Sequence, residues 1–320
     1  MATKIFETTV GTAAPERGPK PLTEGKQSFG ILAGLWSFVI LPFVALIAAV
    51  PVAWGGWLGW TDIALFVPLY MMSGMGVTVG FHRYLTHSSF KATRWLRVTM
   101  AVAGSFAIQG SPTQWVADHR RHHQYSDLEG DPHSPWRFGE SFWGLTKGLF
   151  HAHVGWLFAR DLSNRERFAP DLVADKDIQK VDRLFPLLVL TSVVSPAVVG
   201  GLVTMSWRGA LTAFFWAGLV RIGLLHHVTW AINSVCHVFG ERPFAMRDGD
   251  RASNFWPLAI LSFGESWHNL HHADPTSARH GVLRGQIDSS ARLIWIFEKL
   301  GWVSNVRWPK PDRIKSKLIS

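Results

Sequence analysis

The chain has 320 residues, of which 48% are hydrophobic and 17% charged, with a formal net charge of +9 and a mean hydropathy of +0.11. This hydropathy is high for a water-soluble protein and low for a bare bundle of helices in lipid, so the composition indicates membrane spans plus a sizeable polar domain. The single cysteine, Cys236, excludes an intrachain disulfide and a cysteine-rich metal site.

Residues 1–27 are polar, with several Gly, Pro and Thr, and we expect a disordered tail there. No short apolar segment with a cleavage site follows, which argues against a signal peptide. We expect residues 28–320 to form one domain. It contains four apolar stretches long enough to cross a bilayer, at about 29–54, 61–80, 184–207 and 210–232.

Lysine and arginine are distributed unevenly along the chain. The tail holds four, residues 81–183 hold fourteen and residues 233–320 hold twelve, whereas the two short links between spans hold none and one, Arg208. The positive-inside rule then places both termini and both long segments in the cytosol. Because topology explains the positive charge, we expect no nucleic-acid partner, although the basic face suits anionic lipid.

Three further features complete the predicted fold. The apolar stretches Trp95–Gln109 and Phe142–Phe158 are too short or interrupted to span, so they are interfacial helices, helices packed within the domain, or shallow re-entrant segments. Arg221 interrupts the fourth span and is costly in lipid, so we expect it to face the protein interior or to snorkel. The sequence predicts an all-α membrane protein with four transmembrane helices capped by a cytosolic helical domain.

Histidine is unusually frequent, with fifteen residues, and most lie in short clusters. Three clusters are His82-Arg-Tyr-Leu-Thr-His87, His119-Arg-Arg-His122-His123 and His268-Asn-Leu-His271-His272, and a fourth site is Asn233-Ser-Val-Cys-His237. All of them fall on the side assigned to the cytosol, although the charge count made no use of histidine. The positions of the histidines therefore support the predicted topology independently of the charge count.

The spacing of these histidines is typical of metal ligands. In the second and third clusters the positions i, i+3 and i+4 share one face of a helix, so the imidazoles can converge on an ion. The pair at i and i+5 in the first cluster would point apart on a regular helix, so it lies at a helix end or serves two different ions. Nine histidines are too many for one ion and suit two, and imidazole binds Zn, Cu, Fe and Ni.

With these motifs, HxxxxH, HxxHH, NSxxH and HxxHH in that chain order, the sequence resembles the integral-membrane fatty-acid desaturases. The match is to their acyl-CoA delta-9 (stearoyl-CoA-like) branch, in a bacterial form, and extends from about residue 30 to about residue 310. The resemblance implies two iron ions, with Asn233 bound through a water. It implies nine ligands: His82, His87, His119, His122, His123, His237, His268, His271 and His272.

The resemblance also implies the reaction. The di-iron centre of the family uses O2 to introduce a cis double bond, here at the delta-9 position of a saturated long-chain acyl-CoA, and no catalytic residue beyond the metal centre is implied. A long apolar tunnel must hold the acyl chain so that the reacting methylenes face the irons. The family's tunnel-bend residues match Gln109, Trp115, Thr229 and Trp230.

Two further matches concern the head group of the substrate. Asp118 and Arg160 match positions that contact coenzyme A in animal members. This chain has Ala117 and Asp161, however, where animal members often have Arg and Lys. Two positive charges expected to meet phosphates are therefore missing, and an acyl lipid or another carrier stays open as the alternative to coenzyme A.

The remaining histidines are given other roles. We expect His133 to be structural or to support the metal ligands from outside, and His151, His153 and His280 to lie at helix surfaces or at the membrane interface. His226 and His227 are expected to be buried, each with one hydrogen bond. Glu265 and Asp274 flank the last cluster and are candidates to orient imidazoles as hydrogen-bond acceptors.

Two other functions compete with desaturation. A di-iron hydroxylase of lipid or alkyl substrates shares the first hydrogen abstraction, and only the NSxxH site and the spacings favour a desaturase. A membrane metal transporter would place its ligands inside the spans, whereas these clusters lie outside them.

An electron donor must come from outside the chain. The sequence has no His-Pro-Gly-Gly haem segment, no cysteines for an iron–sulfur cluster and no dinucleotide fingerprint. We expect a separate ferredoxin- or cytochrome-type donor with an NAD(P)H reductase, and a location in the inner membrane of a bacterium with the active site in the cytosol.

Overall fold

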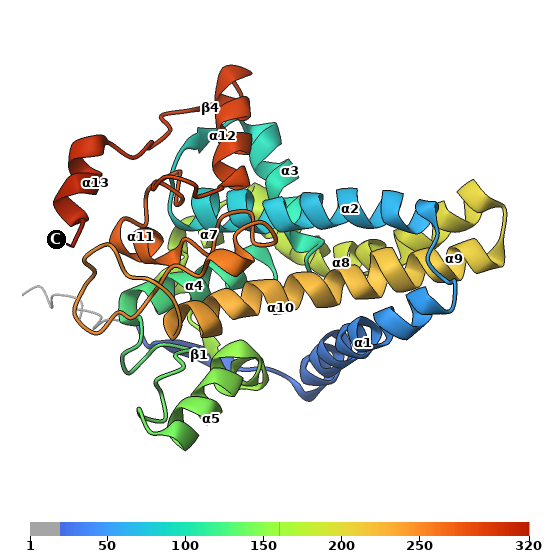
Figure 1. The fold of residues 1–320 in the computed structure, drawn as a ribbon, viewed down its shortest axis with the longest axis horizontal. Coiled ribbons are helices and arrows are strands. Elements are labelled where there is room, and N and C mark those ends of the chain that lie inside the picture. Colours follow the sequence, from blue (N-terminus) through green and yellow to red (C-terminus); the bar gives the residue numbers. More distant parts are fainter. Residues whose placement is uncertain (1–19, 160, 320) are drawn as a thin grey trace, which may run out of the picture.

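The computed structural model describes residues 20–159 and 161–319 and is largely helical (Figure 1). In chain order the elements are β1 (Thr23–Lys26), α1 (Phe29–Trp54), α2 (Trp60–Met75), η1 (Gly76–Thr86), β2 (Lys91–Ala92), α3 (Arg94–Ser105), α4 (Pro112–Tyr125), α5 (Phe142–His153), η2 (Gly155–Phe158), β3 (Asp161–Ser163), α6 (Arg165–Phe168), α7 (Pro170–Ala174), α8 (Lys176–Thr204), α9 (Trp207–Ala213), η3 (Phe214–Val220), α10 (Arg221–Ser234), η4 (Val235–His237), η5 (Trp256–Leu258), α11 (His268–Ala273), α12 (Ser289–Lys299), β4 (Val303–Ser304) and α13 (Pro311–Lys317).

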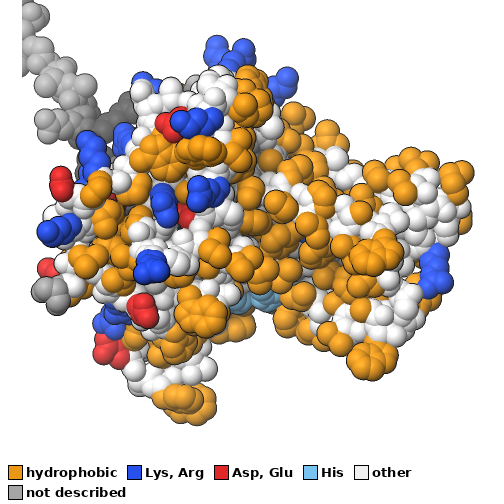
Figure 2. Space-filling model, turned by 45° about the horizontal axis from the view of Figure 1, so that its top comes forward, with side chains coloured by type: hydrophobic (Ala, Val, Ile, Leu, Met, Phe, Trp, Pro, Cys, Tyr) orange, Lys and Arg blue, Asp and Glu red, His pale blue; other side chains and the backbone are white. Residues whose placement is uncertain are grey.

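In the part of the chain that the structure describes, four helical stretches are long and apolar enough to cross a membrane, as the sequence predicts. They run over Phe29–Trp54, Trp60–Thr86, Lys176–Thr204 and Trp207–His237. The last three extend beyond the predicted apolar runs because each continues as helix into the polar domain. Figure 2 shows the result, with charged side chains gathered on one half of the molecule while the other half is almost entirely apolar.

The second span changes its helix type before it reaches the polar domain. The α-helix α2 continues directly as the π-helix η1, and η1 packs closely on α3. Two glycines make this approach possible, because a Cβ on Gly76 would lie 2.2 Å from the backbone nitrogen of Gly104. Because neither glycine has a side chain, η1 can lie directly against α3 at this crossing.

Arg221 faces the protein interior, which is one of the two outcomes expected from the sequence. Its side chain is fully buried and donates to the carbonyl of Ala217 on its own helix and to Ser73, Phe106 and Ser192 on three other segments. Five donors on one guanidinium can satisfy this many acceptors at once. The arginine thus ties the fourth span to its neighbours.

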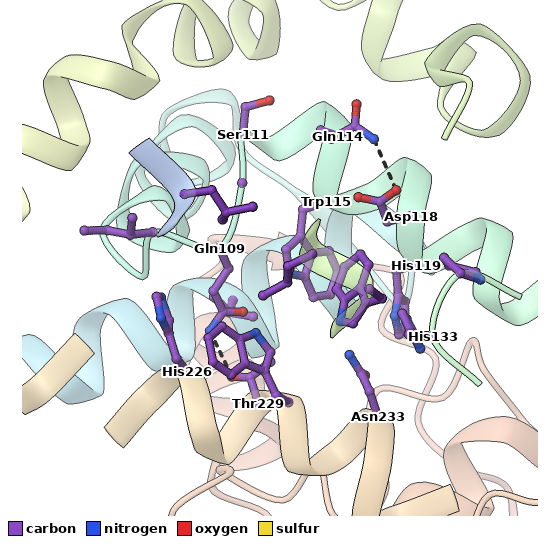
Figure 3. A pocket seen from close by; sticks show the side chains of 18 of the residues that line it. Gln109, Ser111, Gln114, Trp115, Asp118, His119, His133, His226, Thr229 and Asn233 are labelled. Carbon is purple, nitrogen blue, oxygen red and sulfur yellow. Dashed lines mark hydrogen bonds between the residues drawn. The ribbon is translucent and has the colours of Figure 1, made fainter. Parts of the chain in front are cut away.

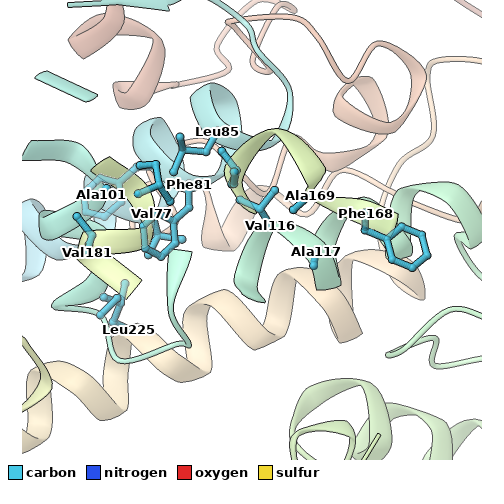
Figure 4. Packing of buried hydrophobic residues seen from close by; sticks show 14 of the residues in the cluster. Val77, Phe81, Leu85, Ala101, Val116, Ala117, Phe168, Ala169, Val181 and Leu225 are labelled. Atoms are coloured by element: carbon cyan, nitrogen blue, oxygen red, sulfur yellow. The ribbon is translucent and has the colours of Figure 1, made fainter. Parts of the chain in front are cut away.

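A cluster of buried hydrophobic residues joins the spans to the polar domain. Val77 and Phe81 of η1 pack there with residues of α3, α4, α8 and α10, among them Ala101, Val116 and Leu225 (Figure 4). Because α4 carries the second histidine cluster and η1 the first, this packing places both clusters against each other at the end of the membrane bundle.

Helices α3 and α5 have different surroundings. Helix α3 packs on η1 and α8 and buries Leu96 and Met100, so it is a domain-packing helix. Helix α5 instead exposes Phe142, Trp143 and Phe150, as expected of a helix at the membrane interface.

Two small antiparallel pairs tie distant segments together. Strand β1 pairs with β3, with Thr23 opposite Ser163, and β2 pairs with β4, with Lys91 opposite Ser304. Residues 1–19 of the segment expected to be disordered lie outside the described residues. The described end of that segment, residues 20–27, contains β1, because the backbone from Thr23 finds hydrogen-bond partners in β3.

Candidate metal centre and acyl cavity

The nine predicted ligands come from four segments that the fold brings to one place. His82 lies on η1 and His87 caps it, His119, His122 and His123 lie on α4, His237 ends η4, and His268, His271 and His272 lie on α11. Their ring nitrogens form two neighbouring groups, and both groups consist only of imidazoles. All nine therefore lie together, at the ends of the second and fourth spans that enter the polar domain.

The first group holds five imidazoles: His82, His87, His119, His123 and His271. The Nε2 atom of His271 lies 3.0 Å from that of His82 and 2.8 Å from that of His123, and His119 and His123 are 3.1 Å apart at the same atoms. The second group holds four: His122, His237, His268 and His272. There, the Nε2 atom of His268 lies 3.1 Å from that of His237 and 3.0 Å from that of His272.

The first histidine pair is brought together by the π-helix. In a π-turn the backbone hydrogen bond runs from i+5 to i, and here the amide of His87 donates to the carbonyl of His82 at 3.2 Å. Positions i and i+5 therefore meet, and the two rings lie 4.9 Å apart in one group. Of the two outcomes open from the sequence, the helix end is right. The π-turn also places both rings in the same imidazole group, whereas the alternative of two different ions applies to a regular helix; the ion that each ring would bind stays a prediction.

These spacings fit metal ions. At a metal–nitrogen distance of about 2.1 Å, two ligands at a right angle have nitrogens about 3.0 Å apart, which is the spacing seen. The Nε2 atoms of His87 and His122 are buried without a hydrogen-bond partner, although each lies in its group. Buried polar atoms are rarely left unsatisfied, so a ligand is expected there.

The protonation of the imidazoles also suits metal binding. Burial, followed by the neighbouring histidines, holds the pKa of His119, His123, His268, His271 and His272 well below its usual range. These rings are therefore neutral at physiological pH, and a neutral imidazole has a lone pair to offer a metal ion.

Among the described residues, four carboxylates lie behind imidazoles of the two groups. Nδ1 of His82 lies 2.5 Å from Glu265, and Nδ1 of His122 lies 3.0 Å from Asp131. Likewise, Nδ1 of His237 and of His272 lie 2.8 Å from Asp127 and Asp250, respectively. Each acceptor turns Nε2 toward the metal position and increases the basicity of the ring.

Glu265 and Asp131 are ionised despite their burial. Burial alone would raise the pKa of Glu265, but His82 and Arg83 together hold it well below its usual range. The same balance, with His122 as the main opposing group, lowers the pKa of Asp131. Both carboxylates therefore remain acceptors over the whole physiological pH range.

Several supporting residues differ from the sequence-based expectations. Asp274 binds Arg313 at 2.6 Å and not an imidazole, so the role predicted for it is wrong, whereas Glu265 lies against Nδ1 of His82, the position that its predicted role requires. Asp127 and Asp250 were not predicted as acceptors for imidazoles, because neither lies at a regular spacing from a histidine cluster. The expectation that His280 lies at the surface is also wrong. It is buried, its ring packs at a tilt against His271 with centroids 4.6 Å apart, and its Nδ1 lies 3.4 Å from Glu265.

The other remaining histidines have simple partners. His133 packs on His122, with ring centroids 4.4 Å apart, and so supports a metal-facing ring as expected. His226 is buried and bonds the carbonyl of Ala107 at 2.8 Å, again as expected. His153 and His227 bond each other at 2.9 Å and are only partly buried.

A cavity of about 980 Å³ reaches both imidazole groups from the side of the spans. His82 and His119 of the first group, His268 of the second and Asn233 line its inner end. Apolar side chains of α1, α8 and α10 line much of the remainder. The volume lies at the upper end of the range for small-molecule sites, and the shape suits a long apolar ligand.

The four residues predicted for a tunnel bend all line this cavity (Figure 3). Gln109 donates to the hydroxyl of Thr229 at 3.0 Å, which joins the loop after α3 to α10. Trp115 stacks on His119, with centroids 5.0 Å apart, and Trp230 lies one residue from Thr229. An apolar chain in the cavity would therefore contact Trp115, which directly touches the first imidazole group.

Of the two predicted head-group residues, Asp118 also lines the cavity. It accepts a hydrogen bond from Gln114 at 3.1 Å, and burial raises its pKa to about 6. Arg160 lies outside the described residues.

The chain is similar to known proteins over most of its length. A family model described as fatty acid desaturase matches residues 58–282. The chain is 39% identical to hex-5-enoyl-[acyl-carrier protein] acetylenase of Moorena producens (strain JHB), over 88% of each chain. It is 34% identical to the sn-1 stearoyl-lipid 9-desaturase of Anabaena variabilis, over 78% of this chain and 85% of the relative. It is 36% identical to delta-9 acyl-lipid desaturase 1 of Arabidopsis thaliana, over 79% and 78%.

Proposed function

The chain belongs to the fatty acid desaturase family, and on this premise we propose that it is an O2-dependent di-iron desaturase that introduces a cis double bond at the delta-9 position of a saturated long-chain acyl group. One observation carries the proposal: a single long cavity is lined by imidazoles of both histidine groups. An acyl chain in it would have its methylenes beside both metal positions. The names of two relatives support the position of the double bond.

Iron is the metal that we propose for both groups. Imidazole donors fit iron, but they also fit zinc, which normally binds more tightly than iron(II) and has no redox chemistry. When bound, the two irons would activate O2 and supply the oxidising power that removes one hydrogen from each of two adjacent methylenes. Asn233 lines the cavity beside His268, where its amide is suited to hold a water on the second iron.

The side chains of the cavity have the task of positioning. Trp115, which stacks on His119, and the hydrogen-bonded Gln109–Thr229 pair both line the cavity, so a chain held against them would present a defined pair of carbons. Fixing this geometry selects the site of hydrogen removal and excludes competing positions. No other side chain needs to take part in bond breaking.

The proposed reaction also consumes electrons and protons. For each double bond, O2 receives the two substrate hydrogens together with two electrons and two protons, and leaves as two waters. The sequence has no haem or flavin motif, so we propose a separate ferredoxin- or cytochrome-type donor with an NAD(P)H reductase. The basic residues of the charged half favour a partner with an acidic face.

The acyl carrier is proposed more broadly than the sequence suggests. Coenzyme A thioesters follow from the resemblance to animal members. An acyl lipid or another carrier is the alternative that the sequence leaves open, and the relatives are named for an acyl-carrier-protein substrate and for lipid substrates, which supports that alternative. The three carriers share the long acyl chain that the cavity would accept.

Fatty-acid profiling tests the function directly. The chain is expressed with a ferredoxin and its reductase in a bacterium that lacks its own desaturase, and the fatty acids are analysed by gas chromatography with mass-spectrometric location of the double bond. We expect a cis delta-9 monounsaturated product with the wild type and none with His122→Ala at the same expression level. A hydroxylated product would point to the hydroxylase instead, and no oxidised product would contradict both.

A further inference from the structure

Helix α1 leaves the membrane bundle over its first half. Its second half packs on η3 and α10, where Pro42 lies so close to α10 that a Cβ on Gly223 would be 2.5 Å from its carbonyl oxygen. Toward its N-terminal end α1 diverges from α10 (Figure 1). Before Pro42, Ile31 and Leu35 line the cavity, and Phe38 lines it while also packing with Val189 of α8 and Ile222 of α10.

The wall of the cavity between α1 and α8 also belongs to the outer surface. Ile31 on α1 and Leu190 on α8 both line the cavity, and they are 61% and 59% exposed. Pro186, one turn before Leu190, lines the cavity and is exposed as well. Residues that face the cavity and the membrane at once border an opening. This opening lies in the half of the bilayer next to the charged domain.

The polar end of the cavity is bordered by a balanced set of charges. Among the described lining residues Arg121, Arg137 and Arg165 are positive, and Asp118 and Asp161 are negative. Arg165 is already paired with Glu24 at 2.5 Å, and Arg121 donates to the carbonyl of Gly130 and the hydroxyl of Ser163. Tight recognition of several phosphates uses clusters of arginines that no carboxylate offsets, whereas among the described residues of this end of the cavity two aspartates lie beside the two arginines that form no ion pair.

From the opening and the balanced charges we propose that the substrate is the acyl chain of a membrane glycerolipid, which slides sideways into the cavity between α1 and α8 while its head group stays at the membrane surface. This inference rests on the proposed desaturase function and names its carrier. The apolar chain never crosses water on this route. The head group needs only a polar rim of the kind formed by Gln27, Gln114 and the two aspartates.

The carrier is tested with the purified enzyme in bilayer nanodiscs, supplied with its electron donor and reductase. Three preparations carry the same stearoyl chain on phosphatidylglycerol in the disc, on coenzyme A, or on acyl carrier protein. Conversion is read by mass spectrometry of the intact carrier, so that the unsaturated chain is found where it was made. We expect the lipid to be converted at least about tenfold faster than either thioester at equal acyl concentration.

Two matched variants test the route. Leu190→Trp adds bulk at the opening, whereas Leu187→Trp adds the same bulk at an equally exposed position, 56% in the wild type, that does not line the cavity. We expect lipid conversion to fall about tenfold with L190W and to stay near the wild-type rate with L187W. Equal metal content and thermal stability of the two variants show that folding is unaffected.

The outcomes separate the two proposals. Faster conversion of either thioester, or lipid conversion that L190W leaves unchanged, would overturn the lateral route while the desaturase function stands. Conversion of none of the three carriers, by an enzyme that has its iron and reduces it with the donor, would count against the desaturase function itself.

Discussion

Asp127 lies in the turn after α4 and supports a metal-facing ring across a distance of 110 residues, since it binds Nδ1 of His237 at 2.8 Å. Removing its charge by Asp127→Asn would leave that ring less firmly oriented and less basic. Loss of a carboxylate of this kind typically lowers metal affinity about 10–100-fold. We expect the second group to release its ion during dialysis against a chelator while the first keeps its own. Metal analysis per chain would then give about half of the wild-type content.

Asp274→Asn is the matched control for this prediction. Asp274 is also buried and close to the last histidine cluster, but its partner is Arg313. It should keep the wild-type metal content. An equal loss of metal from both variants would show that any nearby carboxylate has the same effect, and would contradict a specific role for Asp127.

At the scale of single residues, the sequence predicts metal-facing imidazoles better than the groups that support them. His119, His122 and His123 can be recognised from spacing because one helix turn dictates which side chains share a face. Asp250 could not be recognised in this way, because it meets His272 only through the tertiary fold. His280 looked like a surface residue because its neighbours in the sequence are polar, and its burial depends on packing against Glu265 and His271.

At the scale of elements, the π-helix η1 has a particular importance, since it carries the first histidine pair and crosses α3 with no room for a side chain. Substitution Gly76→Ala would place a Cβ 2.2 Å from the backbone nitrogen of Gly104, and backbone atoms cannot give way cheaply. We expect η1 to shift away from α3, with a destabilisation of about 1–3 kcal/mol from overpacking. The displaced His82 and His87 should then bind metal poorly.

Gly30→Ala provides the comparison. Gly30 also lies in a spanning helix, but a Cβ there would meet no atom within 4 Å. Alanine is a better helix former than glycine, so this variant should be as stable as the wild type or slightly more stable. Thermal unfolding in detergent and metal content measure both effects. If G76A matched G30A in both, the close crossing would not be what positions η1.

The sequence of this protein predicts which segments are helical. It does not predict whether a turn is α or π, or at which residue a helix ends. The apolar runs predict all four spans because their length and lack of charge leave no other structure that can satisfy the backbone in lipid. Apolar length alone does not distinguish an α-turn from a π-turn, so the geometry of the first histidine pair required the structure. The continuation of the fourth span to His237 was also invisible, since the residues after Ile232 are no longer uniformly apolar.

At the scale of the whole molecule, charge and apolar surface divide the protein into two halves (Figure 2). We predict that the charged half faces the cytosol. Because Cys236 is buried and is the only cysteine, single introduced cysteines can report the topology without background. With a membrane-impermeant maleimide, Arg208→Cys should be labelled in intact spheroplasts, and Lys315→Cys only after the membrane is opened. The reverse pattern would invert the orientation.

The origin of the nine imidazoles has a consequence for how the enzyme is made. The first group needs His271 in addition to its ligands on η1 and α4, and three of the four ligands of the second group follow residue 236. A ribosome must therefore translate more than four fifths of the chain before either ion can find its full set of donors. If the two groups hold iron as proposed, the ions can be loaded only after this point, and we predict that loading is a late event in maturation.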